Sequence, residues 1–117
     1  MILPKNNTRE FKLGKLKNKI KYCLVKDKEL DRSTISISVG VGSIMDPLHN
    51  QGLAHFLEHM LFLGNEKYKD EKFFDSHLKK FDGYSNAYTD TFETVYYFSC
   101  LNEGLEVAID CFSHFFI

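Results

Sequence analysis

The sequence lacks the features of membrane-spanning, secreted and disordered chains. Its 117 residues contain no tryptophan and only two prolines, and no proline- or glycine-rich linker or internal repeat divides them. No apolar run approaches the roughly 18 residues that a membrane-spanning helix needs, and the first ten residues hold no apolar core of a secretory signal. With 44% hydrophobic and 26% charged residues, the composition is that of a folded globular chain, which excludes disorder and collagen-like architectures.

Cysteine is also sparse. The three cysteines, Cys23, Cys100 and Cys111, form no C-x-x-C pair, and their odd number indicates no disulfide framework. We therefore expect a reducing compartment, and we assign the chain to the cytoplasm. Each cysteine is expected to be a small buried apolar residue rather than a nucleophile or a metal ligand.

Charge is unevenly distributed, although the net charge is only −1. Residues 1–28 carry nine basic and two acidic side chains, a net charge of +7, and residues 29–117 carry −8. Such a basic arm forms the solvated face of a strand or binds an anionic partner such as a nucleic acid. The solvated face is favoured, and nucleic-acid binding is the weaker alternative, because the lysines interleave with Leu13, Leu16, Ile20, Tyr22 and Leu24.

Hydrophobic periodicity predicts an α+β chain. The expected strands are 9–14, 19–26, 33–42, 84–89 and 92–100. The expected helices cover about 50–63, about 70–81 and a last segment that begins at an Asn102 cap. This order, β-β-β-α-α-β-β-α, predicts a mixed or antiparallel sheet with the helices packed on one face. The last helix carries an apolar stripe that is still running at Ile117.

The chemistry is concentrated in the run His55-Phe56-Leu57-Glu58-His59. On a helix, at about 100° per residue, the two histidines lie about 40° apart and Glu58 lies about 60° to the other side. Two imidazoles at i and i+4 can bind one divalent metal, and a carboxylate beside them can take a proton from a metal-activated water. This H-x-x-E-H order is the inverted form of the H-E-x-x-H metallopeptidase motif.

A polar surface patch is the alternative explanation for two histidines and a glutamate on one helical face. Apolar residues surround the three polar ones, so we expect a helix that is buried nearly all round. Buried histidine and glutamate side chains need partners or a metal, which favours a metal site. The surrounding apolar residues are Leu53, Ala54, Phe56, Leu57, Met60, Leu61, Phe62 and Leu63.

The longer run G-L-A-H-F-L-E-H-M-L-F-L-G at 52–64 resembles the insulinase/pitrilysin family of zinc metallopeptidases. The resemblance implies one Zn²⁺ bound by His55 and His59, with Glu58 as the general base of a metalloendopeptidase. Flanking segments resemble the same family, namely V-G-V-G-S-I-M-D-P at 39–47, S-N-A-Y-T at 85–89, E-T-V-Y-Y-F at 93–98 and D-C-F-S-H-F-F at 110–116.

The resemblance also implies how a substrate binds. An extended peptide adds as a further strand along one edge of the sheet, so the enzyme recognises mainly the peptide backbone. Phe62 is implied to shape an apolar side-chain pocket near the site, with an ordinary core residue as the alternative. The implied edge residues are Ser85, Asn86, Ala87, Tyr88 and Thr89.

Some parts that the family implies are not in this chain. The third zinc ligand of the family is a glutamate expected at about position 135. We therefore interpret residues 1–117 as the N-terminal portion of a single catalytic domain, truncated at its C-terminal end, whose partners are peptide substrates and the rest of the peptidase. The isolated portion is expected to be inactive.

Two alternatives stay open at this point. A non-catalytic homologue that acts as a peptide-binding or scaffold module would keep the fold, although a decayed site usually loses a ligand first, and the H-x-x-E-H motif is intact. Manganese or cobalt could occupy the same ligands in place of zinc.

Overall fold

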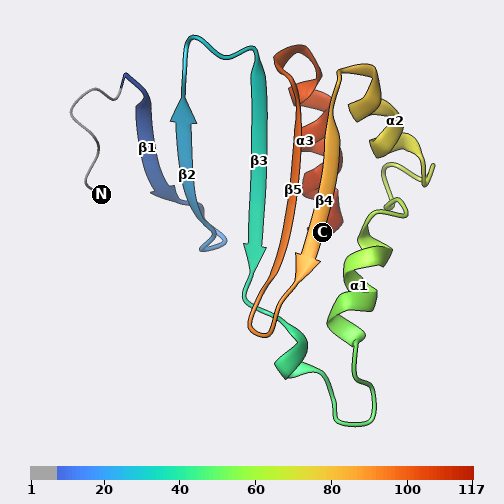
Figure 1. Ribbon diagram of the computed structural model, residues 1–117. Coiled ribbons are helices and arrows are strands. Elements are labelled where there is room, and N and C mark those ends of the chain that lie inside the picture. Colours follow the sequence, from blue (N-terminus) through green and yellow to red (C-terminus); the bar gives the residue numbers. More distant parts are fainter. Residues whose placement is uncertain (1–7) are drawn as a thin grey trace. The chain divides into compact units, whose positions relative to one another are not determined.

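The computed structural model describes residues 8–117, and the chain divides into two compact units, with the sequence boundary between Leu30 and Asp31. The first unit is an antiparallel hairpin of β1 (Glu10–Lys15) and β2 (Lys21–Lys26) (Figure 1). Lys19, at its turn, has a φ of 74°, a left-handed conformation that glycine adopts more easily. The turn closes through a hydrogen bond from the Leu16 N–H to the Ile20 carbonyl (2.8 Å).

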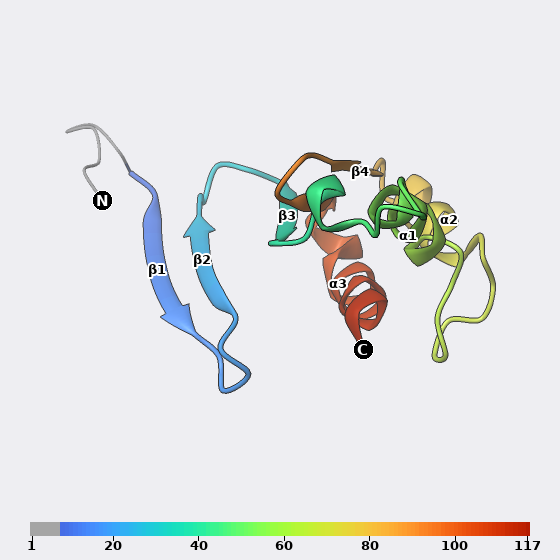
Figure 2. The same cartoon turned by 90° about the horizontal axis from the view of Figure 1, so that it is seen from below.

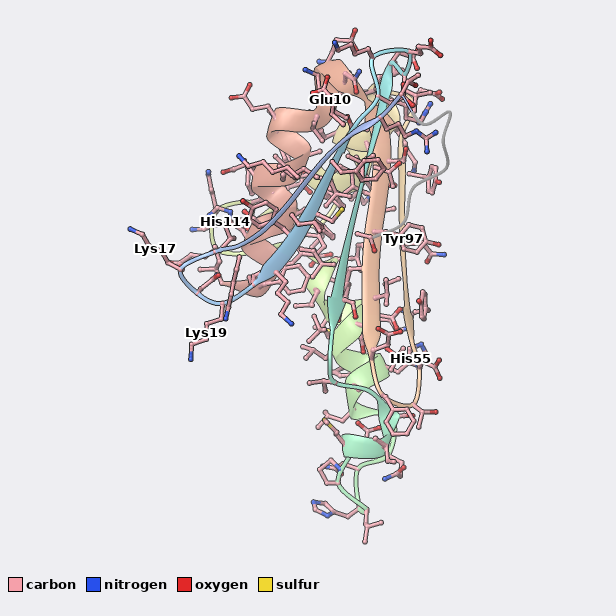
Figure 3. All side chains as sticks on the ribbon, turned by 90° about the vertical axis from the view of Figure 1, so that its left-hand side faces the viewer. Glu10, Lys17, Lys19, His55, Tyr97 and His114 are labelled. Atoms are coloured by element: carbon pink, nitrogen blue, oxygen red, sulfur yellow. The ribbon has the colours of Figure 1, made fainter. Side chains whose placement is uncertain are left out.

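The hairpin lysines are exposed, as the solvated-face interpretation requires. Lys17 and Lys19 project from the turn (Figure 3). The register differs from a simple alternation of wet and dry faces: Leu13 pairs with Cys23, and Leu24 pairs with the neighbouring Lys12, so the two leucines lie on opposite faces. Both leucines are more than half exposed, at 65% and 57%.

The second unit carries helices on one face of a three-stranded antiparallel sheet (Figures 1 and 2). The strand order is β3-β5-β4, with β3 at Arg32–Val39, β4 at Tyr84–Thr89 and β5 at Thr94–Leu101. The α-helices are α1 (Leu53–Leu61), α2 (Phe73–Lys80) and α3 (Leu105–Ser113). Short 3₁₀ turns cover Ser43–Met45, Asn102–Gly104 and His114–Phe116.

The core lies between the middle strand β5 and the helices. Phe98 is fully buried, with its ring centroid 5.6 Å from that of Phe74 on α2 and 5.0 Å from that of Phe112 on α3. Both pairs meet edge to face, which is the favoured arrangement of aromatic rings. The strand flanked on both sides thus anchors two helices through one side chain.

The α+β class and the predicted order of helices and strands are confirmed. The strands form two separate antiparallel sheets. β3 ends at Val39, earlier than predicted, because Val39 is the last residue that pairs with β5. The predicted Asn102 cap is wrong: α3 begins at Leu105, and the Asn102 Oδ1 instead accepts a hydrogen bond from the Ser33 hydroxyl (2.7 Å).

Helix α1 is less buried than expected. Within the described residues, only Ala54 and Glu58 of this helix are buried, and Phe56 is 62% exposed. The helix packs on β4 and β5 through one side, which leaves its other apolar residues without cover from the described part of the chain. The exposed apolar residues on or just after α1 are Leu53, Phe56, Leu57, Met60 and Leu63.

The expectation that cysteines are buried holds for two of three. Cys100 and Cys111 lie in the core, whereas Cys23 of the hairpin is exposed. Burial raises the pKa of the Cys111 thiol to about 11, so this side chain stays a neutral thiol near pH 7. No helix in residues 8–117 is both long and apolar enough to cross a bilayer.

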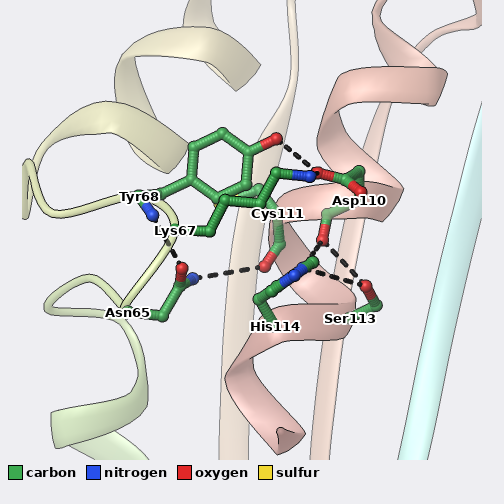
Figure 4. A network of polar contacts seen from close by, with 7 residues as sticks. All are labelled: Asn65, Lys67, Tyr68, Asp110, Cys111, Ser113 and His114. Atoms are coloured by element: carbon green, nitrogen blue, oxygen red, sulfur yellow. Dashed lines mark hydrogen bonds and ion pairs between the residues drawn. The ribbon is translucent and has the colours of Figure 1, made fainter.

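A polar network fastens the connection between α1 and α2 to α3 (Figure 4). Asp110 on α3 accepts hydrogen bonds from the Lys67 ammonium (2.6 Å) and from the Tyr68 hydroxyl. Asn65 accepts from the Tyr68 backbone N–H (2.8 Å) and donates to the Cys111 carbonyl (3.5 Å). The segment that follows the H-x-x-E-H helix is therefore held by side chains rather than by regular secondary structure.

This network predicts a pH-dependent local stability. Lys67 and Tyr68 hold the pKa of Asp110 below its ordinary value, and Asp110 raises the pKa of both partners. Ionised Asp110 therefore stabilises the folded state above about pH 3.9, the pKa of an unfolded aspartate. This stabilisation is lost as the pH falls through the lower pKa of Asp110 in the folded state. The contributions of Lys67 and Tyr68 are present below about pH 10 and are lost above their raised values.

Asp110→Asn should therefore lower the hydrogen-exchange protection of residues 62–72 near neutral pH and flatten its decline in acid. The measurement is exchange mass spectrometry, with rates divided by those of the unfolded chain at the same pH. Asp75→Asn is the control, because Asp75 pairs with Lys79 within one exposed helix face. An acid decline equal in wild type and Asp110→Asn would contradict the assignment.

Candidate metal centre

One face of α1 brings together the three polar residues of the H-x-x-E-H motif. The nitrogens of His55 and His59 and a carboxylate oxygen of Glu58 all lie within 4.8 Å of one another. The two Nε2 atoms are 3.1 Å apart, and the ring centroids are 4.7 Å apart. The histidines are exposed and Glu58 is buried, so the group faces solvent on one side and the sheet on the other.

The two imidazoles fit a divalent metal. Two nitrogens that bind one tetrahedral zinc at about 2.05 Å lie about 3.3 Å apart, close to the observed Nε2 separation. Imidazole nitrogen suits zinc, copper, iron and nickel better than it suits magnesium or calcium. Among residues 8–117, this is the only cluster of three or more His, Cys, Asp or Glu side chains placed to hold a metal.

Glu58 is the buried member of the group. Its Oε2 accepts a hydrogen bond from the Thr89 hydroxyl of β4 (2.5 Å), and the residue is 7% exposed. The Glu58 carboxylate lies close enough to Tyr96 of β5 to contribute, after burial itself, to a raised pKa of that tyrosine. The carboxylate is thus enclosed between α1 and the end of the sheet where β4 finishes.

The start of α1 is fixed by an aspartate outside the helix. Asp46 accepts hydrogen bonds from the backbone N–H groups of Gly52 (2.7 Å) and Ala54 (2.9 Å). Gly52 has a φ of 91°, which turns the chain into the helix. No local sequence pattern indicates this cap, because Asp46 reaches the helix start across the intervening loop 47–52.

The turn between β4 and β5 is attached to the segment that leads to α1. The backbone N–H groups of Ser43 and Ile44 donate to the carbonyls of Asp90 (2.9 Å) and Thr91 (3.1 Å). Gly42 allows this approach, since a side chain there would collide with the Asp90 carbonyl. The strand that carries Thr89 and the helix that carries Glu58 are therefore held by a common loop.

The predicted substrate residues of β4 divide between two faces. Ser85, Ala87 and Thr89 are half-buried on the helix side, whereas Asn86 and Tyr88 are exposed on the other. β4 is an edge strand in the described part of the sheet. The Ala87 backbone N–H donates to the Asn86 side-chain oxygen (2.9 Å) and not to β5, so it points toward the free edge.

Two further observations in this region concern the direction of His55 and the packing of Phe62. His55 points to the same side of the sheet as Tyr97, away from α3 and His114 (Figure 3). The ring of Phe62 packs against Phe115 (5.3 Å between centroids) and Tyr96 (6.3 Å). These contacts are those of a core residue, the alternative considered for Phe62 in the sequence.

Comparisons with known proteins agree on one family. The family model described as insulinase, peptidase family M16, matches residues 21–117. The chain is 43% identical over 109 residues to insulin-degrading enzyme of Homo sapiens, covering 93% of this chain and 11% of that protein. It is 42% identical over 113 residues to the A-factor-processing enzyme of Saccharomyces cerevisiae, covering 97% of this chain and 11% of that protein.

A solved structure supports the fold. The crystal structure of pitrilysin matches with a TM-score of 0.91 and 33% identity, over 95% of this chain and 12% of that one. Insulin-degrading enzyme-like 1, peroxisomal, of Arabidopsis thaliana aligns over the whole chain at 40% identity, again 12% of its own length. The chain thus spans about an eighth of the proteins that it resembles.

Removing the Asp46 cap should weaken the metal site. In the native full-length polypeptide that contains this chain, Asp46→Ala leaves two N–H groups of the first turn unpaired, at a cost of about 1 kcal/mol. Because His55 lies in that turn, we expect a several-fold higher zinc dissociation constant, measured by chelator competition. Asp46→Asn keeps an acceptor and should lose less. Asp75→Ala is the control, and wild-type zinc affinity in Asp46→Ala would refute a role for the cap.

Proposed function

The chain belongs to the insulinase family of peptidases, peptidase family M16, and from this premise we propose that it carries the metal-binding helix and general base of a zinc metalloendopeptidase. The observation that supports the proposal is the grouping of two adjacent imidazoles with a buried carboxylate on one face of α1. The proposed activity is that of the whole polypeptide, and we propose that these 117 residues form the N-terminal portion of its catalytic domain.

The roles of the three side chains follow from their chemistry. His55 and His59 would hold the metal through their Nε2 atoms, which lie 3.1 Å apart. A bound zinc ion supplies Lewis acidity, which polarises the scissile carbonyl and lowers the pKa of water. The Glu58 carboxylate accepts the proton of the attacking water and then delivers it to the leaving amine. Its burial beside the histidines keeps this proton transfer within one site.

A third protein ligand is needed to complete the centre. Catalytic zinc sites keep three protein ligands and one open position. Among residues 8–117, no carboxylate other than that of Glu58 groups with the two histidines. We propose that the third ligand is the glutamate expected at about position 135, and that the 117-residue chain alone shows no turnover.

Substrate binding is proposed to use the free edge of β4. An incoming extended peptide would pair with the strand through its backbone, as in other cases of strand addition. The outward N–H of Ala87 supports this role, and the Asn86 amide that covers it would move aside. The other proposed contacts lie on the same strand, at Ser85, Tyr88 and Thr89.

A non-catalytic peptide-binding module is the competing function. It would use the same strand edge and would not need the proton acceptor. Glu58 is buried at a cost and bonded to Thr89, which favours a catalytic use over a binding module that has no need of a carboxylate there.

Glu58→Gln in the full-length polypeptide should abolish zinc-dependent cleavage of a fluorogenic peptide, lowering kcat by at least about 100-fold, because the amide accepts no proton. Zinc content, measured by atomic emission, should stay near that of wild type, whereas His55→Ala should lose the metal. Glu93→Gln is the matched control on the β4–β5 turn. Turnover retained by Glu58→Gln would refute the base; a wild type without turnover but with peptide binding would establish the non-catalytic alternative.

Strand addition predicts a two-residue period in the substrate. Successive N–H groups of an extended peptide point to opposite sides, so only alternate ones face β4. N-methylation of a cleaved peptide, moved one position at a time, should raise KM at every second residue and leave it within about twofold between them. Equal effects at consecutive positions, measured by the same cleavage assay, would rule out pairing along a strand edge.

A further inference from the structure

The Thr89 hydroxyl makes a contact that substrate binding does not explain. We propose that Thr89 is a positioning residue that fixes one oxygen of the Glu58 carboxylate and so leaves the other free for proton transfer. The inference rests on the proposed function for its catalytic meaning, while the geometric claim stands on the contacts of the described residues.

The two carboxylate oxygens of Glu58 have different surroundings. Oε2 accepts the Thr89 hydroxyl at 2.5 Å, and this is the one hydrogen bond to the Glu58 side chain among residues 8–117. No buried side-chain oxygen or nitrogen in that part of the chain lacks a partner. Oε1 accepts no hydrogen bond from residues 8–117 and is not completely enclosed. One oxygen is therefore anchored and the other is free of hydrogen bonds within the described residues.

Thr89 is itself held in place. It is the last residue of β4 and pairs with Thr94 of β5. The Thr94 hydroxyl donates to the Val41 carbonyl (2.8 Å) and lies 3.4 Å from the Thr89 oxygen. The Thr94 proton is directed mainly to the Val41 carbonyl, and the Thr89 hydroxyl donates its own single proton to Glu58.

The proposal assigns the role to the hydroxyl and not to the methyl group. Thr89 is half-buried on the helix side of β4, where a threonine methyl could equally serve packing alone. Valine keeps the shape and the strand preference of threonine but lacks the donor, and serine keeps the donor but lacks the methyl. The two substitutions separate positioning from packing.

The kinetic test uses the native full-length polypeptide and a fluorogenic peptide. Thr89→Val should lower kcat by about 10- to 100-fold, since a misplaced catalytic group costs up to about 100-fold. KM and the zinc dissociation constant should stay within about twofold, because strand pairing uses the Thr89 backbone, which valine and serine both keep. Thr89→Ser should retain kcat within about threefold of wild type. Thr34→Val is the matched control, because it removes a threonine hydroxyl that donates to Ser99 elsewhere in the same sheet. A Thr89→Val kcat within threefold of wild type, or a serine variant as slow as the valine variant, would overturn the proposal.

Crystal structures of metal-free wild type, Thr89→Val and Thr89→Ser supply a readout that needs no activity. The proposal expects the Glu58 carboxylate to leave its position in Thr89→Val and to keep it in Thr89→Ser. An unmoved carboxylate in Thr89→Val would overturn the positioning role. If wild type hydrolyses no peptide, the proposed function fails, and the crystal structures still decide whether Thr89 orients Glu58.

Discussion

A carboxylate withdrawn from water is costly unless hydrogen bonds replace its hydration, and Glu58 meets that condition through one contact across the fold. The Thr89 hydroxyl joins the carboxylate on α1 to the end of β4, 2.5 Å away and 31 residues along the chain. This pairing ties the buried side of α1 to the end of β4, on the side through which the helix packs on the sheet.

Other contacts hold Glu58 and Thr89 in position for their hydrogen bond. Asp46 fixes where α1 begins, and the bonds from Ser43 and Ile44 fix where the β4–β5 turn lies. Because residues 43–46 make both sets of contacts, one short segment holds both the start of α1 and the β4–β5 turn in place. Beyond the C-terminal end of α1, the hydrogen bonds of Lys67 and Tyr68 to Asp110 hold the segment that follows the helix against α3. The two histidines of the motif are exposed, whereas Glu58 between the helix and the sheet is buried.

The local sequence pattern is sufficient to predict the metal-binding group on α1, but it does not predict the residues that hold this group in position. His55, Glu58 and His59 were placed on one face because helical periodicity relates residues three and four apart, and the structure brings them together. The roles of Asp46 and Thr89 depend on loops and strand pairing, which no periodicity encodes. The wrongly predicted Asn102 cap has the same cause, since a tertiary bond from Ser33 uses the side chain that a cap would need.

We expected α1 to be buried nearly all round because apolar residues surround the motif. Such a count shows that these residues favour burial, but it does not show which part of the protein covers them.

The proposed metal site is tested most directly by X-ray absorption at the zinc edge of the purified full-length polypeptide. We predict two imidazole nitrogens at about 2.0–2.1 Å together with oxygen ligands in wild type, and loss of the zinc absorption itself in His55→Ala. A sulfur-dominated shell, or zinc whose spectrum is unchanged by His55→Ala, would contradict it.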